Sequence, residues 1–335
     1  MRRSLLIFAG LLVTTLALGS ACSSGDKDDP EKINVVTSVS PITSIAENIG
    51  GTRIELEGLV PEGTNSHTFE PPVSDAKKIA KADLIIVNGL DLEDPIIELA
   101  NSNKKSSATL VTLGNQTVTE AQYKFDFSFP KEEGHPNPHL WPDPTKAMRY
   151  AEIIHDALVK ADAKNKDYYD ANYQALRTRL QSLDAAVKTT VNTIPAANRK
   201  LLTYHDSWAY FADTYGMTVI GAIQPSDFSE PSARDVADLI TQIRNEKVPA
   251  VFGSEVFPSP VLEQISKEAN AKFVDKLRDD DLPGKPGDEL HSYIGLMVEN
   301  MRAMAPALGG NASAMDNVDA SLVFTDGKSG AKYPQ

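Results

Sequence analysis

Short apolar runs alternate with amphipathic runs along most of the chain, and this alternation predicts strands that alternate with helices. Some of the apolar runs are continuous, as at 84–87, which is typical of strands buried on both faces of a sheet. In the first half of the chain the apolar runs lie at 33–39, 54–60, 84–87 and 109–113. In the second half they lie at 201–204, 218–223, 250–252 and 273–274. The pattern predicts an α/β fold with two lobes, each a mostly parallel sheet flanked by helices.

A much longer helix is predicted between the two lobes, over residues 165–194. This stretch contains no Gly or Pro before Pro195, and its apolar residues recur every three or four positions. They are Tyr169, Tyr173, Leu176, Leu180, Leu183, Val187 and Ile194. About 30 helical residues at about 1.5 Å each form a rod of about 45 Å with one apolar side. We expect one rigid helix that runs along both lobes, residues 33–164 and 195–310, and joins them.

A coiled-coil dimer is the alternative interpretation of this helix. Its apolar seam lasts only about four heptads, which is short for a coiled coil that holds two chains together. A monomer in which the helix lies against the two lobes is therefore the expectation.

The two ends of the chain carry signals of a different kind. Residues 1–21 consist of a basic head, an apolar run and small residues, the pattern of an export signal. Cys22 follows, as in a bacterial lipobox whose cysteine becomes lipidated, although Gly19 stands where Leu is usual. The alternative is a soluble secreted protein with a free thiol. Residues 22–32 are polar and predict a flexible tether, and residues 311–335 are expected to form a loose tail.

Composition excludes several classes of partner. The formal net charge of the chain is −13, so the basic surface that binds nucleic acid or anionic lipid is not expected. Cys22 is the only cysteine, so no intramolecular disulfide can form. Beyond the export signal no apolar segment is long enough to cross a membrane. Contact with the membrane is therefore expected through the lipid anchor, on the outer face of the cytoplasmic membrane.

The stretch at 137–144, Asn-Pro-His-Leu-Trp-Pro-Asp-Pro, is suited to present one imidazole in one orientation. Its three prolines stiffen the backbone and exclude a regular helix or strand around His139. Asp143 before Pro144 then predicts the start of a helix. Metal sites need ligands that are oriented in this way.

Candidate metal ligands follow strands in both halves of the chain. His67 and His139 lie in loops of the first half, and His205 and Asp275 lie just beyond strands of the second half. Ligands of open α/β sheets bind outside the carboxyl ends of the strands, so two facing lobes would bring these residues into one cleft. Three imidazoles and one carboxylate form a four-coordinate set that suits a divalent ion such as zinc.

Other residues are weaker candidates for the same site. Among the acids, Asp280 within the acidic run 279–281, and Glu255, are alternatives for the fourth ligand. His155 falls within a predicted helix and is expected to be a packing or surface residue. Two further histidines have possible roles near the cleft: His135 as a relay for metal and His291 as an extra ligand.

With these residues in view, the chain resembles the metal-binding solute receptors of bacterial ABC importers, the zinc and manganese group called cluster A-I. The resemblance covers residues 33 to about 308 and is strongest at the motif around His67, at 63–71, and at 137–144. Glu230-Pro231-Ser232 and the run at 293–300 are also similar. The resemblance implies two α/β lobes joined by one long helix. It also implies four metal ligands, at His67, His139, His205 and Asp275.

The resemblance also implies a function, namely a lipid-anchored receptor that delivers a divalent metal to an ABC permease. Three histidines favour zinc, whereas manganese, the alternative, favours more oxygen ligands. A zinc hydrolase is a second hypothesis, but neither His-Glu-x-x-His nor Gly-x-Ser-x-Gly is present, so an enzyme is not expected. A surface adhesin, an activity attributed to some members of the group, is the third.

Overall fold

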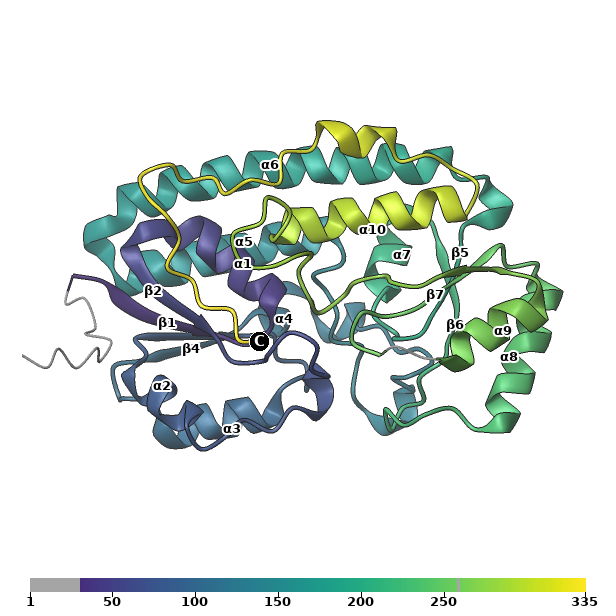
Figure 1. Ribbon diagram of the computed structural model, residues 1–335. Helices are drawn as coiled ribbons and strands as arrows, with labels where there is room; N and C mark the ends of the chain where they lie inside the picture. The colour runs from purple at the N-terminus through teal and green to yellow at the C-terminus, as the bar shows by residue number, and fades with distance from the viewer. Residues whose placement is uncertain (1–30, 258–259) are drawn as a thin grey trace, which may run out of the picture.

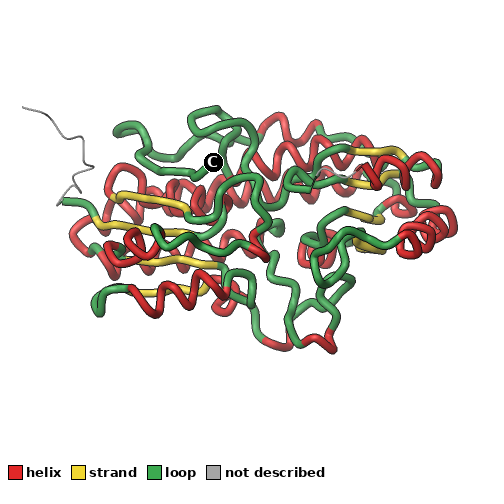
Figure 2. Tube along the Cα trace, turned by 60° about the horizontal axis from the view of Figure 1, so that its bottom comes forward, coloured by secondary structure: helices red, strands yellow, loops and turns green. Residues whose placement is uncertain are grey.

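The computed structural model describes residues 31–257 and 260–335, so Cys22 and the export signal lie outside the described residues. Its strands form two separate four-stranded parallel sheets, one in each lobe (Figure 2). The N-terminal sheet contains β1 (Ile33–Thr37), β2 (Ile54–Gly58), β3 (Leu84–Val87) and β4 (Thr109–Thr112). The C-terminal sheet contains β5 (Lys200–Thr203), β6 (Thr218–Ala222), β7 (Ala250–Phe252) and β8 (Lys272–Val274). Each strand overlaps a predicted apolar run, and the predicted two-lobed α/β fold is confirmed.

Both sheets have the same strand order, β2-β1-β3-β4 in one lobe and β6-β5-β7-β8 in the other. In each lobe the first strand therefore pairs with both the second and the third. Val35 of β1 lies opposite Leu84 of β3, and Thr203 of β5 lies opposite Phe252 of β7. The chain leaves such a pair of strands in opposite directions, which opens a crevice at their carboxyl ends. The two crevices are where the candidate ligands are expected.

Helices cover both faces of each sheet (Figure 1). Those of the N-terminal lobe are α1 (Ser40–Gly50), α2 (Asp75–Lys81), α3 (Asp94–Asn103), α4 (Leu113–Thr117) and α5 (Pro144–Ala161). Those of the C-terminal lobe are α7 (Ala209–Tyr215), α8 (Ala233–Glu246), α9 (Pro260–Ala269) and α10 (Tyr293–Ala307). In the N-terminal lobe, α1 and α5 lie on one side of the sheet, and α2 and α3 lie on the other.

Two adjacent residues of β5 belong to hydrophobic cores on opposite faces of the C-terminal sheet. Leu201 and Leu202 are both fully buried. Leu201 belongs to the core that contains Phe211 of α7 and Met297 of α10, whereas Leu202 belongs to a separate core with Ile243 of α8. Successive side chains of a strand point to opposite faces, so a continuous apolar strand is buried on both sides.

The long helix α6 (Lys166–Thr193) has 28 residues and extends along both lobes (Figure 1). It lies where a helix over 165–194 was predicted, which confirms the single connecting helix. Its apolar side is buried against α5, α1 and α10. Helices of the same chain therefore cover the apolar stripe that a coiled coil would have used as its seam. Within the described residues, no helix combines the length and the hydrophobicity needed to span a bilayer.

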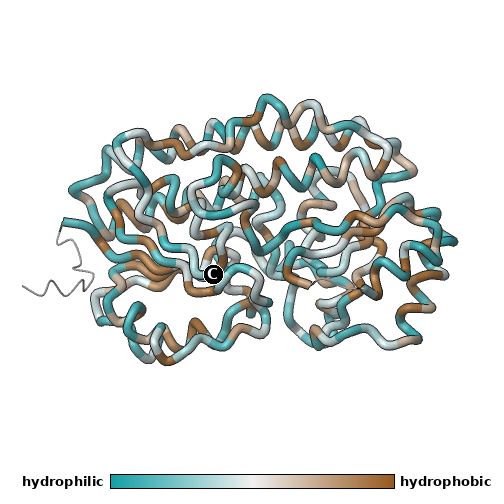
Figure 3. Tube along the Cα trace, in the orientation of Figure 1, coloured by the Kyte–Doolittle hydropathy of each residue, from teal (hydrophilic) through white to brown (hydrophobic). Residues whose placement is uncertain are grey.

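One hydrophobic core continues from the N-terminal lobe into the C-terminal lobe. It includes Ile85 of β3, Leu180 of α6, Met301 of α10 and Phe252 of β7. Hydrophobic residues accordingly gather on the strands and on the inward sides of the helices in both lobes (Figure 3). Because this core is shared, we expect the lobes to tilt only slightly rather than to open on a free hinge.

The sequence had indicated a loose tail at 311–335. In the structure, however, this tail is hydrogen-bonded along its length. It returns along α6 to the N-terminal lobe (Figure 1), where Lys332 pairs with the edge strand β2 next to Glu57. On the way, Arg179 of α6 forms an ion pair of 2.8 Å with Asp319. Tyr333 is buried and donates a hydrogen bond of 2.5 Å to Glu47 of α1. The tail therefore spans from α10 back to the first sheet.

Candidate metal centre

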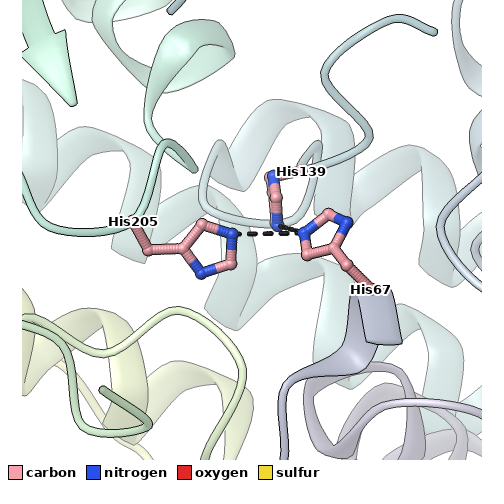
Figure 4. A group of neighbouring side chains, drawn as sticks. All are labelled: His67, His139 and His205. Atoms are coloured by element: carbon pink, nitrogen blue, oxygen red, sulfur yellow. Dashed lines mark hydrogen bonds between the residues drawn. The ribbon is translucent and has the colours of Figure 1, made fainter. Parts of the chain in front are cut away.

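Three histidines from three loops meet between the two lobes (Figure 4). His67 lies in the short 3-10 turn Ser66–Thr68 that follows β2. His139 lies in the proline-rich loop before α5, and His205 lies just beyond the end of β5. The structure thus brings together the three predicted histidine ligands, at the carboxyl ends of strands of both sheets.

The three imidazoles point their Nε2 atoms at one another. His67 Nε2 lies 3.1 Å from His139 Nε2 and 3.1 Å from His205 Nε2. In a tetrahedral zinc site with Zn–N distances of about 2.0–2.1 Å, two nitrogens would lie about 3.3–3.4 Å apart. A single proton on His67 Nε2 could form a hydrogen bond to only one of these two nitrogens, whereas a cation could satisfy all three. The arrangement fits a cation held by all three.

The same local device orients His67 and His139. In each motif an asparagine stands two residues before the histidine, and its side-chain oxygen accepts a hydrogen bond from the histidine N–H. The distance is 3.0 Å from His67 N to Asn65 Oδ1 and 3.1 Å from His139 N to Asn137 Oδ1. Such asparagine turns fix the backbone locally, which explains why Asn-x-His occurs in both motifs.

The Nδ1 atom of His139 has a hydrogen-bond partner and that of His205 faces a carboxylate, which leaves Nε2 free in both rings. His139 Nδ1 lies 2.9 Å from Asn137 Oδ1, which can accept its proton. His205 Nδ1 lies 3.0 Å from Asp279 Oδ2, and both side chains are buried. A partner that holds the Nδ1 proton fixes the tautomer and makes Nε2 the metal-binding atom. The ion pair with Asp279 thus favours Nε2 as the metal-binding atom of His205.

The fourth position is approached by a turn of three acids, Asp279, Asp280 and Asp281. Ring nitrogens of His139 and carboxylate oxygens of Asp279 and Asp280 lie within 4.8 Å of one another. Asp280 Oδ2 accepts a hydrogen bond of 2.7 Å from Ser66 Oγ, while its Oδ1 is buried and has no hydrogen-bond partner. A buried carboxylate oxygen without a partner is costly unless a cation satisfies it. Asp279 Oδ1 is also buried without a partner, but Asp279 faces His205 Nδ1 through its other oxygen, so Asp280 is the stronger candidate for the fourth position.

Asp275, predicted as the fourth ligand, is exposed and does not join the histidines. It directly follows β8, and its carbonyl lies so close to Gly253 that a side chain on Gly253 would clash with it. The chain continues past this contact before it turns towards the cleft at Asp280. The acidic run at 279–281 was the available sequence signal, since three consecutive acids are rarely buried without a partner.

Glu255, the other alternative ligand, has a different role in the structure. Its Oε1 accepts hydrogen bonds from three successive backbone N–H groups, those of Asp279, Asp280 and Asp281, at 2.9, 3.1 and 3.0 Å. It is not among the residues whose ligand atoms gather with the histidines in the described part of the chain.

Burial and neighbouring charges shift the pKa values of the site. Burial, together with the charge of His205, lowers the pKa of His67 well below its usual value, and His139 is affected in the same way. Burial also acts to lower the pKa of His205, but the charge and hydrogen bond of Asp279, together with the charges of Asp280 and Asp206, outweigh it and raise this pKa. Burial and the charge of Asp279 raise the pKa of Asp280 to about 7. His67 and His139 are thus neutral at pH 7, the form that binds metal.

Aromatic rings enclose the three imidazoles, and sequence reasoning had not identified them. Phe228 stacks on His67 with ring centroids 4.4 Å apart, and Phe129 lies 5.5 Å from the same ring. Trp141 packs against His139 at 5.1 Å. Phe228 and Phe129 come from loops with no periodic pattern, so the sequence offered no signal for them. The rings limit access of water to the imidazoles.

The remaining histidines lie outside this site. His155 pairs with Asp170 at 2.8 Å and stacks on Tyr173, in keeping with a packing role. His135 is exposed and pairs with Asp91 at 2.9 Å. His291 is buried, and its Nδ1 lies 3.1 Å from the carbonyl oxygen of Pro283.

Comparisons with known proteins agree with this geometry. Residues 35–307 match the family described as ZnuA, zinc-uptake complex component A periplasmic. The chain is 30% identical to the manganese ABC transporter substrate-binding lipoprotein PsaA of Streptococcus pneumoniae, over 91% of this chain and 97% of that protein. It is also 30% identical to the iron-binding protein YfeA of Yersinia pestis, over 89% and 92%.

Solved structures show the same likeness. The periplasmic zinc-binding protein TroA of Treponema pallidum is similar with a TM-score of 0.75 and 28% identity, over 83% of this chain and 99% of that chain. A manganese-bound periplasmic metal-binding protein of Candidatus Liberibacter asiaticus is similar with a TM-score of 0.72 and 26% identity, over 83% and 100%.

Proposed function

The chain belongs to the family of periplasmic metal-binding components of zinc-uptake complexes, and we propose that it is the extracytoplasmic metal receptor of an ABC importer. The observation that carries this proposal is the meeting of three histidine Nε2 atoms between two lobes, with the carboxylates of Asp279 and Asp280 within reach of His139. The metal is the cargo, which the receptor captures in the cleft and delivers to the permease.

The proposed ligands are His67, His139, His205 and Asp280. Each histidine faces the other two with its Nε2, and Asp280 has an Oδ1 without a hydrogen-bond partner. Asp275 has no part in this set, because it is exposed at the end of β8. Four protein ligands are the number that a closed tetrahedral zinc site requires.

Zinc is the favoured cargo and manganese the alternative. Three imidazoles and one carboxylate suit zinc, whereas manganese favours more oxygen ligands. Asp280 can bind through one or both oxygens once it releases Ser66, which would raise the coordination number and admit manganese. The relatives themselves are named for zinc, manganese or iron, so the cargo is decided by experiment on this chain.

Two features favour a receptor over a zinc hydrolase. A catalytic zinc keeps an open position for water or substrate, whereas the proposed set occupies four positions with protein atoms. His139 and His205 are 0% and 2% exposed, and Phe228 stacks on the half-buried His67, so little room is left for a substrate beside the ion.

The anchor at Cys22 forms part of the proposal. Several relatives are named as lipoproteins, among them PsaA and the manganese-binding lipoprotein MntA of Halalkalibacterium halodurans. Lipidation of Cys22 would hold the receptor at the outer face of the cytoplasmic membrane, beside the permease. A diacylglycerol anchor carries two acyl chains, which suffice for stable attachment.

The decisive test is metal analysis of protein purified from cells grown in defined medium, combined with growth of a deletion strain. We expect about one zinc per chain, because the proposed ligands form one closed tetrahedral set. Growth of the strain should be restored by added zinc and not by manganese. Rescue by manganese alone would overturn the choice of metal and keep the receptor function. A protein that binds neither ion would overturn the receptor function itself.

A further inference from the structure

Glu255 stands outside the proposed ligand set but is directly connected to it. It lies in the loop after β7, and its Oε1 accepts the three successive N–H groups of the acidic turn 279–281. Consecutive backbone N–H groups that converge on one oxygen form an anion-binding nest. Here the acceptor is a side chain of the same lobe, so the turn is wrapped around the Glu255 carboxyl group.

The three acids of this turn face three different groups. Asp279 lies 3.0 Å from His205 Nδ1, and Asp280 accepts a hydrogen bond from Ser66 and leaves its second oxygen for the metal. Asp281 Oδ2 accepts a hydrogen bond of 2.7 Å from the N–H of Gly63, in the other lobe. The conformation of one turn therefore decides the tautomer of His205, the place of Asp280 and one contact across the cleft.

We infer that Glu255 is a positioning residue for the metal site, which holds the turn 279–281 so that Asp280 can complete the coordination. This inference rests on the proposed function. Without an acceptor at Glu255, three buried N–H groups would lose their partner, and the turn would reorganise to satisfy them. The acidic side chains would then leave the positions that face the histidines.

Glu255 could affect metal binding in three ways: as the acceptor that positions the turn, as a direct ligand, or through its negative charge. Two substitutions distinguish the first of these from the other two. Glu255→Gln keeps a carbonyl-type oxygen at the same reach but removes the charge and weakens any direct bond to metal. Glu255→Ala removes the acceptor altogether. Glu263→Gln, an exposed acid on α9 of the same lobe, removes one charge without touching the turn and serves as the control.

Zinc affinity of the purified protein is the first measurement, by competition with a chelator. We expect Glu255→Ala to weaken zinc binding by about 10–100-fold, the range for residues that orient metal ligands. Glu255→Gln and Glu263→Gln should remain within about threefold of wild type, because neither removes the acceptor. Equal loss in Glu255→Gln and Glu255→Ala would show that the charge or a direct bond matters, and would overturn the inference. Wild-type affinity in Glu255→Ala would overturn it as well.

Hydrogen exchange of the metal-free protein is the second measurement, and it does not depend on the proposed function. The amides of residues 279–281 should exchange faster in Glu255→Ala than in wild type or Glu255→Gln, while the amides of β5 stay unchanged. If wild type binds no metal, the receptor function fails, while the exchange result still tests whether Glu255 holds the turn 279–281. If wild type binds zinc and the exchange is unaltered in Glu255→Ala, the positioning role of Glu255 is wrong and the receptor function stands.

Discussion

Asp281 of the C-terminal lobe accepts a hydrogen bond of 2.7 Å from the backbone N–H of Gly63, which belongs to the N-terminal loop that carries His67. Ser66 of the same loop donates to the neighbouring Asp280 at 2.7 Å. Two adjacent acids of one lobe therefore hold the loop of the other lobe, beside the proposed metal site. We expect such contacts across the cleft to slow its opening and the exit of metal.

Loss of the contact between Asp281 and Gly63 should accelerate metal release. In Asp281→Ala we expect the dissociation rate of zinc to rise by roughly tenfold or more, since hydrogen bonds to charged groups contribute about 1.5–3 kcal/mol. Asp281→Asn keeps an acceptor for the Gly63 N–H and should lie between wild type and Asp281→Ala. Stopped-flow release into excess chelator measures the rates. A dissociation rate unchanged in Asp281→Ala would show that the contact does not restrain the cleft.

The proposed ligands should be separable from their neighbours by single substitutions. His67→Ala, His139→Ala, His205→Ala and Asp280→Ala should each weaken zinc binding by more than about 100-fold, beyond the range for residues that only orient ligands. Asp275→Ala and His155→Ala should bind like wild type, because Asp275 is exposed at the end of β8 and His155 pairs with Asp170. Competition titration gives all six affinities. A loss in Asp275→Ala equal to that in Asp280→Ala would contradict the assignment.

Asn137 should matter for metal binding although it is not a ligand. Its Oδ1 faces both the N–H and the Nδ1 of His139, and its Nδ2 donates 2.8 Å to the carbonyl of Asp206. Asn137→Ala removes the partner that fixes the tautomer, so we expect a loss of about 10–100-fold in zinc affinity. Asn103→Ala, on the exposed end of α3, is the matched control. Equal affinities of the two variants would refute the role of Asn137.

The tail should stabilise the fold without taking part in binding. Tyr333 is 8% exposed and packs its ring against His291, with centroids 4.7 Å apart. Tyr333→Ala should lower the free energy of unfolding by about 3–5 kcal/mol, the range for large aromatic residues. The rise in melting temperature on adding zinc should stay as in wild type. Calorimetry with and without zinc tests both statements, and a smaller zinc-dependent rise would connect the tail to the site.

Cys22 is predicted to be lipidated, and its substitution should change where the protein is found. Cys22→Ser should move the protein from the membrane fraction to the soluble fraction, because the polar tether that follows it offers no other anchor. Fractionation of cells followed by mass spectrometry of the N-terminal peptide checks this. A wild-type protein that is soluble and carries no lipid would disprove the anchor.

Sequence reasoning succeeded where the signal is local. Continuous apolar runs identified the strands, and Asp143 before Pro144 identified the start of α5, where Asp143 Oδ1 accepts the Thr145 N–H at 2.8 Å. The histidines were found because motifs and strand ends mark them. These features depend on residues within a few positions of one another, and their physical causes can be read from the printed order of residues.

It failed where a distant contact decides the outcome. The choice of Asp280 over Asp275 depends on the turn that wraps around Glu255, more than 20 residues earlier in the chain. The tail appeared loose because it is polar and without period, yet Phe324 and Tyr333 are both buried by residues of the first lobe. No local pattern reports such contacts.

The core shared by the two lobes has a consequence for how the protein unfolds. Residues of β3 and β7 belong to one cluster that α6 and α10 complete, although the C-terminal lobe also has a second core of its own beside α8. Removing one lobe would expose the side of α6 that the other needs covered. We therefore expect the two lobes to unfold together, as one cooperative unit, although the chain looks like two domains. Neither half is expected to keep its structure without the other.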